Sequence, residues 1–118
     1  MAFDECTDYP STYEDAEESM NLTHRWAKRS VNYFHEKKKG HLLFGIVQGG
    51  MHEELRKKSL EYMTNLDLDG VALGGLSVGE PKEEKTKVLK LLAPLLPKNK
   101  PHYVMGVGTP EELVEGVR

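Results

Sequence analysis

Four groups of polar or glycine residues follow short apolar runs, and they are the parts of this sequence best suited to chemistry. They are Asp4-Glu5-Cys6, Gln48-Gly49-Gly50, Gly74-Gly75-Leu76-Ser77 and Met105-Gly106-Val107-Gly108. Taken singly, each has a simpler structural interpretation, since a glycine after a strand most often only permits a tight turn. Two glycine pairs among four such positions, however, favour a backbone that comes close to a flat ligand.

On one rim of a fold, these groups would match the edge of guanine. Asp4 could accept the adjacent N1–H and 2-amino donors, and Gln48 or a backbone N–H could donate to O6. Met105 could supply a polarizable surface against the ring, although a core methionine is the commoner case. The residues alone therefore indicate a purine-like pocket, and they do not by themselves specify a reaction.

The elements that must position these groups alternate along the chain. One strand is predicted to end at Phe3, and three others are predicted to cover 42–47, 70–73 and 102–105. Helices are predicted to cover 11–39, 53–65, 81–92 and the residues from 109 onward. Four β–α repeats of about 30 residues predict a parallel sheet, in an open doubly wound fold or in part of a barrel. Four units are about half of a (β/α)8 barrel, and we expect one domain over 1–118.

Local signals predict where the helices begin and end. Ser11 with Glu14 predicts a capping box for the first helix, and the run 109–112 predicts another for the last helix. The lysines at 37–39 are expected to be solvated cations at a helix C-terminus rather than an RNA patch. The last helix stops at Arg118 after scarcely two turns, and this end suggests truncation.

Composition predicts a soluble globular protein and offers no support for a broad nucleic-acid surface. The hydrophobic fraction is 38%, the charged fraction 30% and the formal net charge −3, so any RNA contact requires a local patch. The single cysteine, Cys6, excludes an internal disulfide and is consistent with a reducing compartment. No membrane span or signal peptide is evident, and we expect a cytoplasmic protein.

Five motifs resemble those of the bacterial tRNA-guanine transglycosylases, also called queuine tRNA-ribosyltransferases. They are Phe3-Asp4-Glu5-Cys6-Thr7 with Tyr9-Pro10, Arg25-Trp26-Ala27-Lys28-Arg29-Ser30, Phe44-Gly45-Ile46-Val47-Gln48-Gly49-Gly50, Gly74-Gly75-Leu76-Ser77-Val78-Gly79-Glu80 and Tyr103-Val104-Met105-Gly106-Val107-Gly108. The match runs nearly end to end, in the same order and with similar spacing, so it is far more specific than any single glycine pattern. The chain is therefore interpreted as an internal piece of such an enzyme.

This resemblance implies a (β/α)8 barrel with a zinc-binding subdomain and a base exchange on tRNA. Guanine at the anticodon wobble position is replaced by 7-aminomethyl-7-deazaguanine in queuosine biosynthesis, and an aspartate attacks the ribose C1′ as guanine leaves. This is covalent catalysis by a carboxylate, and the target base must leave its stack to enter the pocket. The resemblance also implies tRNA as the partner and a homodimer for the full-length protein.

The resemblance also suggests roles for individual residues. Asp4 is similar to the aspartate that binds the N1–H and 2-amino edge, while Gln48 and the Gly75 N–H are similar to the groups that bind O6. The Leu76 carbonyl resembles the acceptor for the ammonium of the incoming base, and Met105 resembles the residue that packs on the ring. Seven consecutive residues resemble a family segment that contacts the tRNA: Gly106, Val107, Gly108, Thr109, Pro110, Glu111 and Glu112.

Other family features are expected outside these 118 residues. The nucleophilic aspartate is expected beyond Arg118, the zinc ligands further downstream, and the proton-handling aspartate and stacking tyrosine before Met1. Cys6 and five scattered histidines cannot build the family's zinc site of three cysteines and a histidine. No catalytic residue, metal ligand or cofactor is therefore assigned here, and the chain alone is expected to be inactive. Val78 is similar to the bacterial type, which favours the aminomethyl base over queuine.

Two alternative functions remain open. The chain could be a non-catalytic half-barrel that binds a base or serves as a partner subunit. It could also belong to another (β/α)8 enzyme with a phosphate site at Gly74-Gly75 or at 105–108, although no basic residue is adjacent in sequence to either glycine group.

Overall fold

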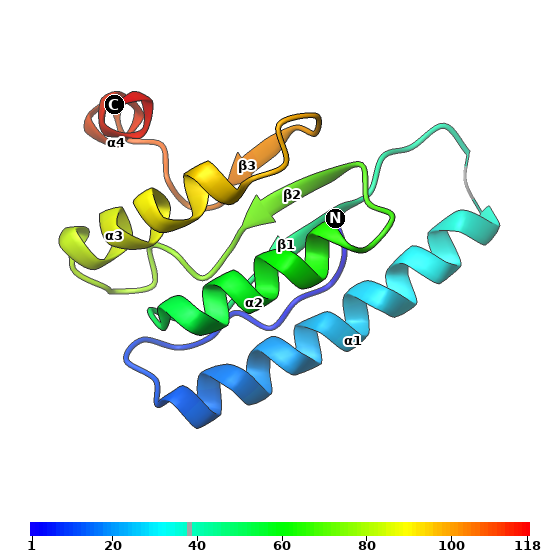
Figure 1. Ribbon diagram of the computed structural model, residues 1–118, viewed down its shortest axis with the longest axis horizontal. Helices are drawn as coiled ribbons and strands as arrows, with labels where there is room; N and C mark the ends of the chain where they lie inside the picture. Colours follow the sequence, from blue (N-terminus) through cyan, green and yellow to red (C-terminus); the bar gives the residue numbers. More distant parts are fainter. Residues whose placement is uncertain (38) are drawn as a thin grey trace.

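The computed structural model describes residues 1–37 and 39–118, so Lys38 of the predicted solvated lysine run lies outside the described residues. Its elements, shown in Figure 1, are α1 (Tyr13–Lys37), β1 (Phe44–Val47), α2 (Glu53–Thr64), β2 (Gly70–Leu73), a helix α3 (Lys82–Leu92) followed by the 3-10 turn η1 (Ala93–Leu95), β3 (His102–Val104) and α4 (Pro110–Val117). None of the helices in the described part of the chain has the length and apolar character needed to cross a membrane.

The three strands form one parallel sheet in the order β1-β2-β3. Phe44 pairs with Gly70, and Val71 pairs with His102. Each neighbouring pair of strands is joined through a helix, as parallel strands require. The prediction of alternating β and α elements with a parallel sheet is therefore confirmed for these three strands.

The prediction of a fourth strand ending at Phe3 is wrong for the described sheet. The segment contributes one backbone hydrogen bond to β1, from Ala2 N to Phe44 O at 2.8 Å. Beyond it, the backbone turns to α1 instead, because Glu5 N donates to Thr23 Oγ1 at 2.9 Å and Glu5 O accepts from Ser19 Oγ at 3.4 Å. Peptide groups that are bonded to side chains of a helix cannot continue a strand ladder.

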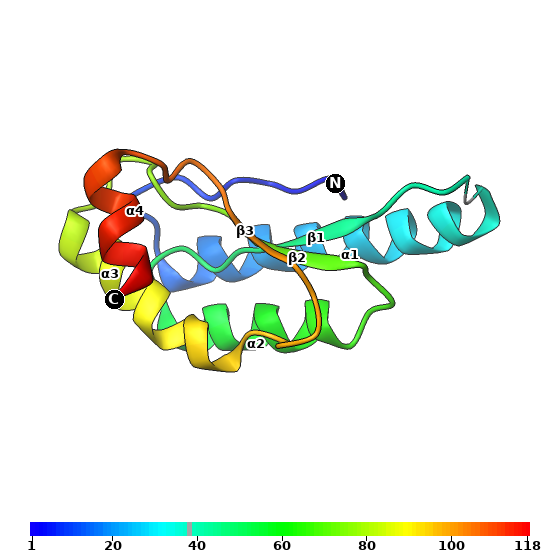
Figure 2. The same ribbon diagram turned by 90° about the horizontal axis from the view of Figure 1, so that it is seen from above.

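Helices α2 and α3 cover one side of the sheet, the N-terminal segment lies on the opposite side, and α1 runs at the level of the strands (Figure 2). The extents of 41 × 32 × 21 Å agree with two layers rather than three. An open doubly wound sheet carries helices on both faces, whereas barrel helices lie only outside the strands. The arrangement is consistent with part of a barrel.

The main core lies between the sheet and its helices. Val47 and Leu73 from the strands pack with Leu60 and Met63 of α2 and with Val88 of α3. Since side chains alternate along a strand, Ile46 and Gln48 point to the opposite, helix-free side.

Helix ends follow the sequence with one correction. Thr12, not Ser11, caps α1, because Asp15 N donates to Thr12 Oγ1 at 3.1 Å. The capping box of α4 is confirmed, since Thr109 and Glu112 bond each other's backbone N–H. In both helices the cap depends on residues three positions apart. In α1, a shift by one residue therefore replaces the Ser11 hydroxyl with the Thr12 hydroxyl.

Candidate functional site

Two of the predicted pocket residues form a hydrogen bond across 44 positions of sequence. The amide Nε2 of Gln48 donates to Asp4 Oδ2 at 2.7 Å. Gln48 is fully buried at the end of β1, and Asp4 is half-buried on the extended N-terminal segment. The carboxylate and the amide therefore lie side by side at the carboxyl end of the sheet, as their positions after apolar runs predict.

The glycine pair after β2 makes room for this amide. A Cβ on Gly74 would lie 2.8 Å from Gln48 Nε2, and a Cβ on Gly75 would lie 2.4 Å from Gln48 Oε1. Gly75 also has a φ of 65°, in the left-handed region. The pair thus brings bare backbone against Gln48, whereas the sequence predicts only a close approach to a ligand.

The oxygen of the Gln48 amide is the exception in an otherwise bonded site. Gln48 Oε1 is buried and accepts no hydrogen bond from any group in the described ranges. Buried polar atoms are nearly always bonded. The Gln48 amide therefore keeps an unused acceptor at Oε1, in addition to the N–H that it donates to Asp4.

Arg56 is the residue that sequence reasoning missed. Its side chain is fully buried, and its guanidinium donates to four backbone carbonyls: Gly50 O at 2.6 Å, Val47 O at 3.2 Å, Gly74 O at 2.7 Å and Gly75 O at 3.2 Å. Burial lowers its pKa to about 10, which leaves it charged near neutral pH. One signal was present, because Arg56 precedes Leu60 and Met63 by four and seven positions and so lies on the buried stripe of α2.

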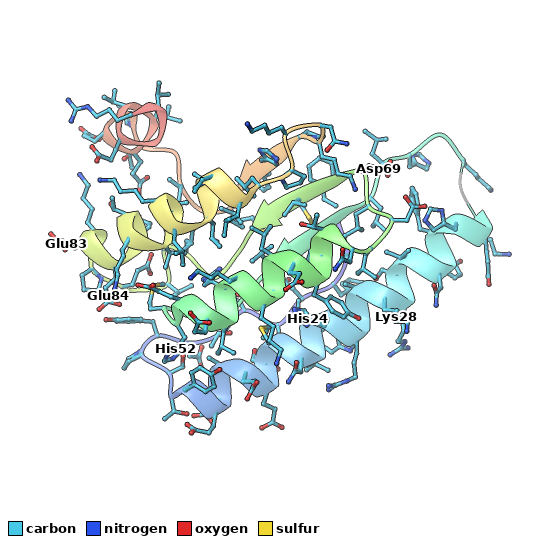
Figure 3. The ribbon with its side chains drawn as sticks, in the orientation of Figure 1. His24, Lys28, His52, Asp69, Glu83 and Glu84 are labelled. Atoms are coloured by element: carbon cyan, nitrogen blue, oxygen red, sulfur yellow. The ribbon has the colours of Figure 1, made fainter. Side chains whose placement is uncertain are left out.

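A second support for Gln48 comes from α1 and α2. Gln48 N donates to Ser59 Oγ at 3.1 Å, and that hydroxyl also bonds His24 Nε2 at 3.0 Å. His24 lies between the two helices (Figure 3) and stacks on Tyr62 with ring centroids 4.1 Å apart. Burial, together with the charge of Lys58, lowers the pKa of His24 to about 4, so its ring is neutral at pH 7.

The loops after β2 and β3 meet beside the glycine pair. Met105 N donates to Leu73 O at 3.0 Å, and a Cβ on Gly106 would lie 3.3 Å from Leu76 O. Leu76 is buried and Met105 is half-buried. These contacts bring all five predicted substrate-binding residues to one end of the sheet, which is the end where parallel α/β folds bind ligands.

The predicted RNA-contacting segment continues from this end and is mostly exposed. Val107 and Glu112 are half-buried. The Oε2 of Glu112 accepts from Gly108 N and Thr109 N, each at 3.0 Å, and its Oε1 bonds Lys85. The bond from Lys85 and then these backbone donors lower the pKa of Glu112 to about 2. Glu112 therefore maintains the loop, and contact of the segment with RNA stays a prediction.

Hollows in the surface do not coincide with the bonded site. A cavity of about 390 Å³ lies between the segment 7–11 and the first turns of α2 and α3, and Gly75 is its one predicted site residue. Asp4 borders another hollow, of about 590 Å³, with Trp26 and Arg29 of α1. The hydrogen-bonded cluster, unlike either hollow, combines directed polar groups with burial.

No three His, Cys, Asp or Glu side chains within 1–37 and 39–118 lie close enough together to hold a metal ion. Cys6 is an exposed free thiol whose pKa is raised, first by partial burial and then by the charge of Asp4. The residues present therefore do not fit a zinc cluster.

Comparison with known proteins identifies close relatives. A family model described as queuine tRNA-ribosyltransferase matches residues 1–118. The chain is 58% identical to the queuine tRNA-ribosyltransferase of Actinobacillus pleuropneumoniae serotype 5b, 56% to that of Haemophilus influenzae and 53% to that of Photobacterium profundum. Each match covers the whole chain but only 31%, 31% and 32% of the respective relative.

Proposed function

The chain belongs to the queuine tRNA-ribosyltransferase family, and from this premise we propose that the protein is a tRNA-guanine transglycosylase whose base-recognition pocket these residues supply. The reaction exchanges guanine at the anticodon wobble position of tRNA for 7-aminomethyl-7-deazaguanine. The observation that carries this proposal is the buried pairing of Gln48 with Asp4 against the backbone of Gly75.

The hydrogen-bonding capacity of this cluster supports recognition of guanine. A carboxylate has about four acceptor sites, so Asp4 can keep its bond from Gln48 while accepting the N1–H and 2-amino donors of the base. The Gln48 amide has a second N–H beside the one given to Asp4, and this proton is available for O6. The Gly75 N–H, which faces the thiol of Cys6, is the second donor that we assign to O6.

Two further residues complete the proposed pocket. The carbonyl of Leu76 accepts from the ammonium of the incoming aminomethyl base, and Met105 packs against the ring. A base can reach these groups only if it leaves its stack in the anticodon loop. We expect the mostly exposed segment 106–112 to contact the tRNA next to the flipped nucleotide.

Chemical catalysis is assigned to groups outside these residues. The family reaction needs an aspartate nucleophile, which attacks C1′ while the base leaves with the electrons of the glycosidic bond. Asp4 is engaged by Gln48 and is assigned to recognition. The described residues thus select the base, and the reacting carboxylate belongs to the remainder of the protein.

The test compares Asp4→Ala with Asp8→Ala in the full-length protein that carries this chain. Loss of the Asp4 carboxylate strands two donors of the base in a dry pocket, at about 1–3 kcal/mol per unsatisfied group, so kcat/KM for guanine exchange into tRNA should fall about 100-fold or more. Asp8 is exposed, and its loss should change the folding free energy by about 0.5 kcal/mol or less.

Equal effects of the two substitutions on kcat/KM would contradict the assignment of Asp4 to the pocket. A wild-type protein that binds guanine but exchanges no base would favour the alternative function, a non-catalytic base-binding or partner subunit.

A further inference from the structure

Arg56 is a buried cation whose hydrogen-bond partners are all neutral. Within the part of the chain that the structure describes, its guanidinium donates to four backbone carbonyls and forms no ion pair with a carboxylate. Burying a charge without a countercharge in contact is costly, and the more distant charge of Glu80 offsets only part of the effect of burial on the pKa of Arg56. The position of this charge directly behind the proposed pocket therefore needs an explanation beyond packing.

The four carbonyls belong to the two loops that form the pocket. Val47 O and Gly50 O lie on either side of Gln48 in the chain, and the other two acceptors are Gly74 O and Gly75 O. The planar fork of an arginine holds several acceptors in a fixed geometry. One side chain on α2 thus sets the position of the Gln48 loop relative to the Gly75 loop.

The bond to Gly74 O has a particular consequence for the Gly75 N–H. The carbonyl of Gly74 and the N–H of Gly75 belong to the same peptide group, which is planar and trans. Its C=O and N–H point in opposite directions, so a carbonyl held on the guanidinium directs the N–H away from it. A charge-assisted bond to the carbonyl also polarises the peptide and strengthens the bond that its N–H can donate.

We propose that Arg56 is a positioning residue that acts through the Gly74–Gly75 peptide to aim and strengthen the hydrogen bond from Gly75 N–H to the 6-oxo group of the bound purine. This inference rests on the proposed function, in which Gly75 binds O6. It makes Arg56 a determinant of specificity for 6-oxopurines, although the side chain never touches the base.

The probe is a pair of purines that differ only at the 6-position. 6-Thioguanine keeps the N1–H and 2-amino donors that Asp4 accepts but carries a weakly accepting sulfur in place of O6. Dissociation constants of guanine and 6-thioguanine are measured for the full-length wild type and for Arg56→Met, Arg56→Lys and Lys57→Met. Lys57 is the matched control, because it is the exposed neighbour of Arg56 on the same helix.

Arg56→Met should weaken guanine binding by about tenfold, the worth of one hydrogen bond to the base, and should leave 6-thioguanine binding almost unchanged. The guanine dissociation constant of Arg56→Lys should lie between those of the wild type and Arg56→Met, since lysine keeps the charge but loses the planar fork of donors. Lys57→Met should match the wild type for both purines.

Several results would overturn the proposal. A general loss of structure weakens both purines by the same factor, and equal weakening would show that Arg56 only stabilises the fold. Unchanged binding of guanine, or failure of both Arg56 variants to fold, would likewise count against it. A wild type that binds neither purine would instead overturn the proposed function itself.

Discussion

Gly75 is constrained by its backbone and by its neighbours at the same time. Its φ is 65°, and a Cβ there would lie 2.4 Å from Gln48 Oε1 and 3.2 Å from Arg56 Nη2. Both neighbouring side chains are fully buried and held by hydrogen bonds, so neither can move aside without breaking one. Only glycine satisfies both conditions.

Gly75→Ala should therefore lower the free energy of unfolding by more than the backbone cost alone, which is about 1–2 kcal/mol for a left-handed residue. Gly40→Ala is the matched control, because Gly40 has a φ of 76° with nothing within 4 Å of its Cβ position. Gly108→Ala, without positive φ and in open space, should cost least. Urea unfolding of the three variants of the full-length protein gives the order, and equal effects at 75 and 40 would refute the close contact with Gln48.

At the scale of elements, α2 supports the proposed pocket from behind. Arg56 binds the carbonyls of both pocket loops, and Ser59 accepts the backbone N–H of Gln48. Through the same hydroxyl, His24 connects α1 to this support. The helices thus act as a second layer that holds polar groups of the strand ends in place.

The neutral state of His24 predicts how stability depends on pH. Its pKa is lowered from 6.5 to about 4 in the folded protein, so the unfolded chain binds the proton more readily between these values. The contribution of His24 to the free energy of unfolding should be greatest above pH 6.5 and should fall as the pH drops toward 4. Below pH 4, His24 should cause no further loss of stability. The loss is on the order of 3 kcal/mol, at about 1.4 kcal/mol per pKa unit.

Denaturant unfolding of the full-length protein across pH 4–7 measures this dependence. His24→Gln removes the titrating group and should flatten the slope in that window, while His41→Gln, at an exposed position, should leave it unchanged. A slope that survives in His24→Gln would assign the dependence to another group.

At the scale of the whole molecule, the sheet has one covered face and an open edge. β3 pairs only with β2 in the described sheet, and Tyr103 on it is 48% exposed. Apolar side chains of α4 are also exposed, with Val117 at 90%. Unpaired strand edges and apolar patches favour association with other chains.

The 118-residue chain on its own is therefore expected to self-associate or to behave as a loosely packed monomer. Sedimentation velocity at rising concentration measures the first outcome, and amide hydrogen exchange of β1 to β3 measures the second. A strictly monomeric chain with strongly protected strands would show that the open edge and helix-free face are tolerated in water.

Short-range features of this protein were determined by the sequence alone. The strand Gly70–Leu73 and the capping box of Thr109 and Glu112 were predicted where the structure has them, because each depends on residues a few positions apart. The order of Gln48 and Gly75 along a β–α alternation was enough to predict one common rim, since parallel strands bring their carboxyl ends together. Asp4 reaches the same rim from a segment that is not a strand of the described sheet.

Tertiary structure alone decided the contacts between distant segments. Nothing local indicates that Arg56 meets carbonyls up to 19 positions away, or that Glu5, just beyond the predicted strand end at Phe3, bonds side chains of α1. The approach of the glycine pair to a ligand stays a prediction, and folding alone decided that the pair also lies against Gln48. Apolar residues that recur every 2.0 residues in a strand or every 3.6 residues in a helix indicate which side of the element is buried. The partner of a buried polar group is determined only when the segments pack.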